Sequence, residues 1–187
     1  ERLRLRQKEI PLLETVRNVH QGIQDLFVRK QVTGPLRGLD SLQDVATIIR
    51  EQGHLEPPSS LIPKTDLTND SVGPYRTCQP ALGMTLSEVL NKWLVWFGLA
   101  ESVIVDEDFR DAESIRIKPI GLEKEVSLAS VGVGVSQSLE PILDCLLSQP
   151  GSLILLEQPE LHLHPALQKK MAEFLLIFAE HGRQIIV

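Results

Sequence analysis

Residues 152–187 constrain the fold of this chain more than any other segment. A short apolar run (SLILL, 152–156) has the composition of a strand that is buried on both faces. Pro165 stands where the first turn of a helix favours proline, and Gly182 marks the predicted end of that helix before a second apolar run, residues 184–187. A strand, a helix and a strand at this spacing predict a right-handed βαβ unit with parallel strands. The expected apolar face of the helix consists of Leu167, Met171, Phe174, Leu175 and Phe178.

A glycine-bearing loop that runs into a helix precedes this unit, within residues 126–149. Gly132 and Gly134 would let backbone amides approach a ligand closely, and Ser136 is the predicted cap of a helix that starts near Gln137. A helix N-terminus with free N–H groups attracts anions, phosphate above all. Many glycine-rich loops before helices are only tight turns, so this feature alone is weak evidence for a binding site.

Carboxylates follow the buried strand directly, in the sequence EQPE (157–160). Open α/β sheets bind ligands at the carboxyl ends of their strands, and a carboxylate there suits a hydrated Mg²⁺ ion. The alternation of Glu160, His162 and His164 leaves zinc as a rival, since these side chains would share one face of a strand. Zinc is the less favoured metal, because it expects three or four protein ligands and no further ligand is obvious.

The glycine-bearing loop, the helix and the sequence EQPELHLHP (157–165) together resemble the C-terminal half of ABC-type AAA-domain ATPases, relatives of the SMC and overcoming-lysogenization-defect proteins. The Walker B segment of these proteins commonly reads DEPELHLHP, which this chain matches at all but the first two residues. GVGVSQ (132–137) is similar to their ABC signature, and GPLR (34–37) also recurs in the family. The match is tight over residues 126–187 and loose over residues 30–125. It implies an α/β fold: the C-terminal half of a P-loop NTPase lobe with a parallel sheet, preceded by a mostly helical region.

The resemblance also implies ATP and Mg²⁺ as cofactors. Glu157 takes the Walker B position and would hold Mg²⁺ through water, while Gln158 stands where the family's catalytic glutamate usually sits. A glutamine cannot take a proton but can orient an attacking water, or Glu160 could supply the base. The residues implied to meet ATP held by a second protomer, or to signal between the two sites, are Gly132, Gly134, Ser136, Gln137 and His162.

Local patterns divide the rest of the chain. Residues 1–54 are expected to form a helical region with a helix at 12–28, the GPLR turn and a short helix at 41–52, and the Pro- and Ser-rich residues 55–80 a loop or insertion. Residues 81–125 predict a helix over 85–98 and short strands at 103–105 and 115–120. Thr85 and Glu88 form the capping box of that helix and Gly98 its stop. Cys145 is expected in the core, and His20, His54 and His181 at the surface.

Composition narrows the class of protein and its partners. Two cysteines, no signal peptide and no apolar run long enough for a membrane span favour a cytoplasmic protein. No P-loop motif, G-x-x-x-x-G-K-[ST], occurs in the sequence. An ATP site would therefore need the N-terminal ATPase half, which would lie before Glu1 or on another chain. The resemblance of residues 132–137 to the ABC signature also implies a facing partner, such as a second copy of this chain. Residues 1–37 carry eight Lys or Arg against four acids in a chain of net charge −6. This basic end is most simply a solvated helix face, and DNA binding is the alternative.

Two functions of different classes remain at this stage. The first is an ATPase whose Mg-ATP-dependent dimerisation and hydrolysis drive a conformational switch, by analogy in DNA repair or phage defence and acting on an effector protein or DNA. The second is a non-catalytic regulatory or scaffold domain that keeps the ATPase surface for assembly, which Gln158 and the missing P-loop favour.

Overall fold

The computed structural model describes residues 30–33, 39–58, 61–63, 78–106 and 115–187, with side chains from Val45 onward. The expected helix over 12–28, the GPLR turn and His20 lie outside these residues. The described part is a mixed α/β fold, as the sequence predicts. Among the described residues, no helix is both long and apolar enough to cross a bilayer.

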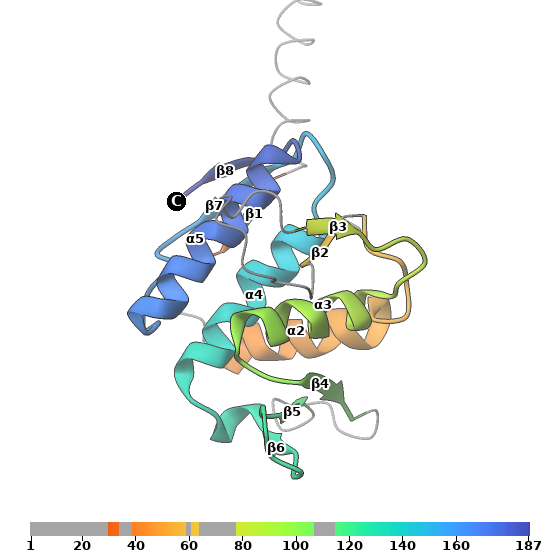
Figure 1. Cartoon of the computed structure of the whole chain (residues 1–187), viewed down its shortest axis with the longest axis vertical. Coiled ribbons are helices and arrows are strands. Elements are labelled where there is room, and N and C mark those ends of the chain that lie inside the picture. Colours follow the sequence, from red (N-terminus) through yellow and green to blue (C-terminus); the bar gives the residue numbers. More distant parts are fainter. Residues whose placement is uncertain (1–29, 34–38, 59–60, 64–77, 107–114) are drawn as a thin grey trace, which may run out of the picture.

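A three-stranded parallel sheet forms one end of the described structure (Figure 1). Its central strand is β7 (Leu153–Leu156), flanked by β1 (Lys30–Thr33) and β8 (Gln184–Ile186). Both neighbours run parallel to β7, with Lys30 opposite Leu153 on one side and Gln184 opposite Leu153 on the other. β1 was not predicted from the sequence, because four residues are too few to show an apolar periodicity. Its pairing partner, β7, lies far away in the chain.

Helix α5 (Pro165–Glu180) connects β7 to β8 and confirms the predicted βαβ unit. Pro165 is in the first turn, and the backbone leaves the helix through Gly182, whose φ of 87° only glycine adopts without strain. The predicted apolar face packs inward: Met171, Phe174, Leu175 and Phe178 are buried and Leu167 is half-buried.

Helix α3 (Leu86–Phe97) has the predicted ends. Thr85 Oγ1 accepts a hydrogen bond from the Glu88 amide at 3.3 Å, and the Glu88 carboxylate accepts one from the Thr85 amide at 2.7 Å. The hydrogen bond from the Thr85 amide, and then a second that the Thr85 hydroxyl donates to the same carboxylate at 3.0 Å, lower the pKa of Glu88. Gly98 ends the helix in the left-handed conformation. Its apolar side chains are buried, and Trp93 lies edge-on to Phe174 of α5 with ring centroids 4.7 Å apart.

Two small antiparallel sheets flank the helices (Figure 1). Within the segment expected as a loop or insertion, β2 (Leu61–Pro63) pairs antiparallel with β3 (Cys78–Pro80), two short strands that the sequence patterns did not predict. Trp93 connects this strand pair to α3, because its indole N–H donates to the Leu61 carbonyl at 2.9 Å. Proline-rich composition hid these strands, whose pairing is not a local property.

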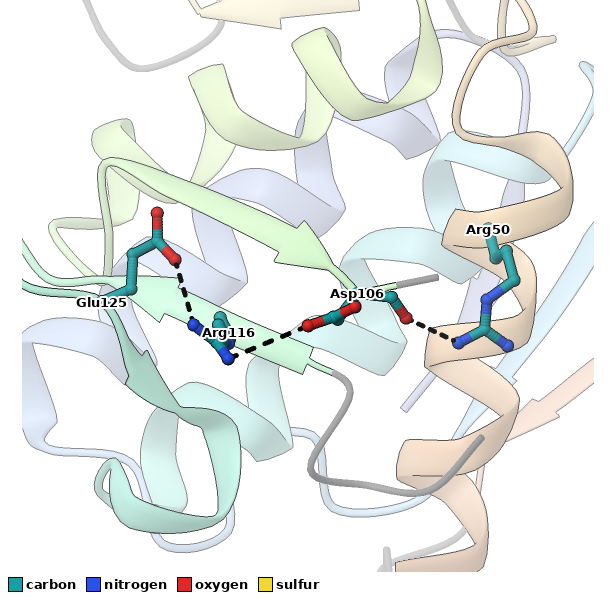
Figure 2. Close-up of polar contacts among 4 residues, drawn as sticks. All are labelled: Arg50, Asp106, Arg116 and Glu125. Atoms are coloured by element: carbon teal, nitrogen blue, oxygen red, sulfur yellow. Dashed lines mark hydrogen bonds and ion pairs between the residues drawn. The ribbon is translucent and has the colours of Figure 1, made fainter. Parts of the chain in front are cut away.

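The second antiparallel sheet consists of β4 (Ser102–Val105), β5 (Ile115–Lys118) and β6 (Val126–Ser127). Its first two strands confirm the predicted pair. Figure 2 shows Arg116 between two carboxylates, at 3.8 Å from Asp106 and 4.0 Å from Glu125. Arg50 on α2 (Leu39–Gln52) donates to the backbone carbonyl of Asp106 at 3.2 Å, so it connects this sheet to the short helix that the sequence predicts. The Arg116 pairs are long and half-exposed, and they add little stability.

Candidate functional site

Helix α4 (Val133–Leu147) follows the glycine-bearing loop, but it begins four residues earlier than the sequence analysis expected. Its N-cap is Gly132, so no side-chain hydrogen bond caps the helix. The expectation that Ser136 caps the helix is therefore wrong: Ser136 is inside the helix, and its hydroxyl donates to the Val133 carbonyl at 2.9 Å. A serine in the first turn can bond backward to the helix itself, so the Ser-Gln pair did not mark the boundary.

The two glycines of the loop are not demanded by the surrounding structure. Gly132 has φ −59° and ψ 145°, and a Cβ there would meet nothing within 4 Å. A Cβ on Gly134 would make ordinary contacts, 3.6 Å from Leu163 Cδ2 and 3.8 Å from the His162 carbonyl oxygen. Neither residue has a positive φ. Side chains are therefore sterically possible at both positions. Any requirement for glycine would come from a ligand or partner that approaches the backbone of the loop.

The remaining candidates on α4 differ in exposure. Gln137 is 8% exposed and faces the core side of the helix. Ser138, which is fully buried, donates to the Gly134 carbonyl at 2.7 Å. Ser136 is half-buried. The surface of this helix N-terminus is therefore formed mainly by Gly132 and the 55% exposed side chain of Val133.

The loop between β7 and α5 carries the other candidate residues and has an unusual backbone. Two of its non-glycine residues have a positive φ, 49° at Gln158 and 62° at His162. Two overlapping turns shape it: the Leu161 amide donates to the Gln158 carbonyl at 3.0 Å, and the Leu163 amide to the Glu160 carbonyl at 3.1 Å. Left-handed backbone at such residues is sparsely populated and gathers at functional sites and switches.

The polar and apolar side chains of this loop point in different directions. Pro159 and Leu163 are buried, whereas Glu157, Gln158 and Glu160 are exposed. Within the described part of the chain, no hydrogen bond or ion pair engages these three polar side chains. The carboxylate of Glu157 directly follows β7 and is a suitable oxygen donor for a hydrated Mg²⁺, which takes one or two protein carboxylates and keeps several waters. The donor set therefore fits Mg²⁺ completed by phosphate and water.

The two histidines of the loop do not share a face as they would on a strand. His162 is exposed in the left-handed conformation, and His164 is the N-cap of α5, where its Nδ1 accepts a hydrogen bond from the Ala166 amide at 3.3 Å. Among the residues that the structure describes, no group of three or more His, Cys, Asp or Glu could hold a metal ion. The geometric premise of the zinc alternative is therefore absent.

The structure brings the two sequence motifs together. The space beside Gly134 is bounded by the backbone of His162 and the side chain of Leu163, so the start of α4 lies against the end of the β7–α5 loop. The start of α4 is thus adjacent to His162 and Leu163, which end the loop that also carries the acidic segment.

Two polar side chains that no sequence pattern singled out make hydrogen bonds around the candidate site, one to the β7–α5 loop and one to the C-terminal end of α4. Gln168, on the first turns of α5, donates from its side-chain amide to the Leu163 carbonyl at 3.1 Å and to the Glu160 carbonyl at 3.4 Å. Arg183, 5% exposed, donates at 2.9 Å to the carbonyl of Ser148, the C-cap of α4, and burial lowers its pKa. No short motif contains either residue. A polar side chain early in the helix after the motif is the only sequence feature that pointed to Gln168.

Comparison with known proteins gives one finding. Residues 88–187 match the family model described as "AAA domain, putative AbiEii toxin, Type IV TA system". No curated protein and no solved structure matches the chain. The family match covers α4, the β7–α5 loop and the whole βαβ unit, and it supports a nucleotide-binding domain of the P-loop NTPase type. It does not separate the ABC, SMC and overcoming-lysogenization-defect subtypes.

Proposed function

This chain belongs to that AAA-domain family, and we propose that it supplies one side of a site that binds and hydrolyses Mg-ATP to drive a conformational switch. The site requires a P-loop, which the 187 residues do not contain, from an N-terminal ATPase half or a facing chain. The proposed subtype is the ABC type, in which a signature loop faces the nucleotide of a second protomer.

The contact between the start of α4 and the β7–α5 loop carries this proposal. In this contact the first turn of a 15-residue helix lies beside His162 and Leu163, at the end of the loop that also bears Glu157, Gln158 and Glu160. Amides at a helix N-terminus favour phosphate, and carboxylates at the end of a parallel strand favour the metal that accompanies it. This contact supports a site in which the two groups that a Mg-nucleotide requires lie close together.

Each exposed residue has a distinct proposed role. Glu157 holds Mg²⁺ through water, and ATP supplies the phosphoryl group that water attacks. Gln158 orients that water through its carboxamide, and Glu160 accepts a proton from it. Gly132 and Gly134 leave the Val133 and Gly134 amides uncovered by side chains of their own. Half-buried Ser136 is a further proposed contact to the facing nucleotide, and His162 lies at the interface between the two sites. Gln137, which is 8% exposed, would have to turn outward to make such a contact.

Gln158 favours a second candidate function. An amide cannot act as a base, and the side chains of Gln158 and Glu160 show no mutual hydrogen bond in the described structure. A domain that binds ATP without turning it over would serve as a nucleotide-gated scaffold on the same surface. The proposed cellular setting, a cytoplasmic switch acting on DNA or an effector protein in repair or phage defence, is common to both functions. The basic residues 1–37 support DNA binding as a further alternative, in which the affinity for DNA should fall steeply as the salt concentration rises.

The test is ATP turnover by this chain together with its P-loop partner segment, compared with three variants. Glu160→Gln should lower kcat by roughly 100-fold or more while nucleotide binding persists, as expected for loss of a general base. Glu180→Gln, the same change at an exposed site at the end of α5, is the matched control and should leave kcat unchanged. Gly134→Ala should keep the thermal stability, because the Cβ has room, but should lower turnover by covering an amide.

The outcomes separate the two functions. ATP binding without turnover in the parent protein would refute hydrolysis and leave the scaffold. Failure of the parent protein to bind ATP would refute both.

A further inference from the structure

The side chain of Gln168 is directed at the loop that carries the proposed chemistry. Its Nε2 donates to the Leu163 carbonyl at 3.1 Å and, through a longer contact, to the Glu160 carbonyl at 3.4 Å. Its backbone amide donates to the His164 carbonyl at 3.0 Å, so the same residue is tied into the first turn of α5. Gln168 therefore links a rigid helix to both ends of the second loop turn.

The loop needs such a link, because its own hydrogen bonds are few and its backbone is unfavourable. Its two turns are closed by hydrogen bonds to the carbonyls of Gln158 and Glu160, and two non-glycine residues, Gln158 and His162, have a positive φ. Backbone of this kind persists only where the surroundings over-determine it. The side chain of Leu163 is buried and anchors the loop in the core. The side-chain amide of Gln168 donates hydrogen bonds to the backbone of the loop.

We propose that Gln168 is a positioning residue, which fixes the 158–163 turns and thereby aims Glu160 at the attacking water. The proposal rests on the proposed function for the role of Glu160, but the restraint of the loop is a property of this chain alone. A primary amide has two N–H donors, one for each carbonyl. A carboxylate of the same shape has none and would face two carbonyl oxygens.

The substitution Gln168→Glu therefore tests the donors with almost no change in volume. In the full chain, hydrogen exchange of the Leu161 and Leu163 amides should accelerate about tenfold, because these amides lie in the released turns. Lys169→Ala is the matched control on the adjacent position, where an exposed side chain makes only a 3.8 Å ion pair with Glu173. It should leave exchange at both amides unchanged.

The kinetic measurement uses the same two variants with the P-loop partner present. Gln168→Glu should lower kcat about tenfold with the KM for ATP within about twofold of the parent, because misplacing a catalytic group affects the transition state more than binding. Thermal denaturation is measured in parallel, since a merely structural role would change the Tm and KM together with kcat.

The results distinguish failure of this inference from failure of the proposed function. Unchanged exchange at Leu161 and Leu163 in Gln168→Glu would overturn the restraint, whatever the kinetics show. Faster exchange with unchanged kcat in an active enzyme would overturn the positioning role while the ATPase stands. Absence of turnover in the parent protein would overturn the proposed ATPase, and with it the positioning role.

Discussion

Alanine at position 53 would place its Cβ 2.5 Å from Ser87 Oγ and closer still to the carbonyl oxygen of Ile49. Real Cβ contacts essentially never come within 3.0 Å, and the Ile49 carbonyl belongs to the backbone of α2, so it cannot rotate away. Gly53 lies where the end of α2 meets the start of α3. Its amide donates to Ile49 at 2.8 Å and its carbonyl accepts from the Ser87 amide at 3.0 Å. The substitution must therefore separate the two helices or break these hydrogen bonds.

The expected magnitude follows from those contacts. Overpacking of this kind costs about 1–3 kcal/mol and each strained hydrogen bond about 1 kcal/mol, while the stiffer unfolded chain returns about 0.4–1 kcal/mol. A net loss of about 3 kcal/mol corresponds to a Tm lower by about 6–12 °C in a protein of this size. Thermal denaturation followed by far-UV circular dichroism measures it. Gly132→Ala is the control, because a Cβ there meets nothing within 4 Å and the φ of −59° suits alanine. A Gly53→Ala protein with a Tm within about 2 °C of the parent would refute the reasoning.

Three further results are expected. Lys170→Ala should lower the free energy of unfolding by about 1–2 kcal/mol relative to Lys169→Ala in a denaturant titration, because Lys170 Nζ donates to two carbonyls at the end of α3, at 2.8 and 3.1 Å; equal stabilities would contradict this. The hydrogen bond from Lys118, and then that from the Gly121 amide, lowers the pKa of Glu101 below 4.5, so its stabilisation is present above that pH and is lost as the pH falls through the folded-state pKa. In acid titrations, Glu101→Gln should therefore lose less stability than the parent below about pH 4.5, and parallel curves would count against it. Cys145 is fully buried and burial raises the pKa of its thiol, so iodoacetamide should alkylate Cys145 only after unfolding. Alkylation of Cys145 in the native protein would show that α4 opens.

Much of the fold was predictable because it is determined by neighbours in the sequence. The capping box of Thr85 and Glu88, the left-handed Gly98 and the proline at the start of α5 each act within one or two turns of backbone. The apolar spacing of α5 and the buried type of β7 were equally local, and the helix and strands that they predict are present. For the candidate site, the sequence motifs predicted the residues, and the structure shows the start of α4 adjacent to His162 and Leu163 in the β7–α5 loop. Their roles stay predictions.

What the sequence could not determine depends on distant partners. β1 is a strand because β7 lies beside it, and β2 pairs with β3, from a distant part of the chain, and accepts a hydrogen bond from the Trp93 indole at Leu61. The start of α4 at Val133 was missed, since Ser136 offered a plausible cap and its hydroxyl bonds inside the helix instead.

By itself, then, the sequence determined the order and kind of the principal elements and the acidic and glycine-bearing segments between them, because caps, turns and periodicity act over a few residues. Only the tertiary structure decided that Gly134 lies against Leu163, that two loop residues adopt a positive φ and that Gln168 reaches back to Glu160. These contacts and backbone angles depend on how α4, the β7–α5 loop and α5 pack together, so no single segment of the sequence determines them.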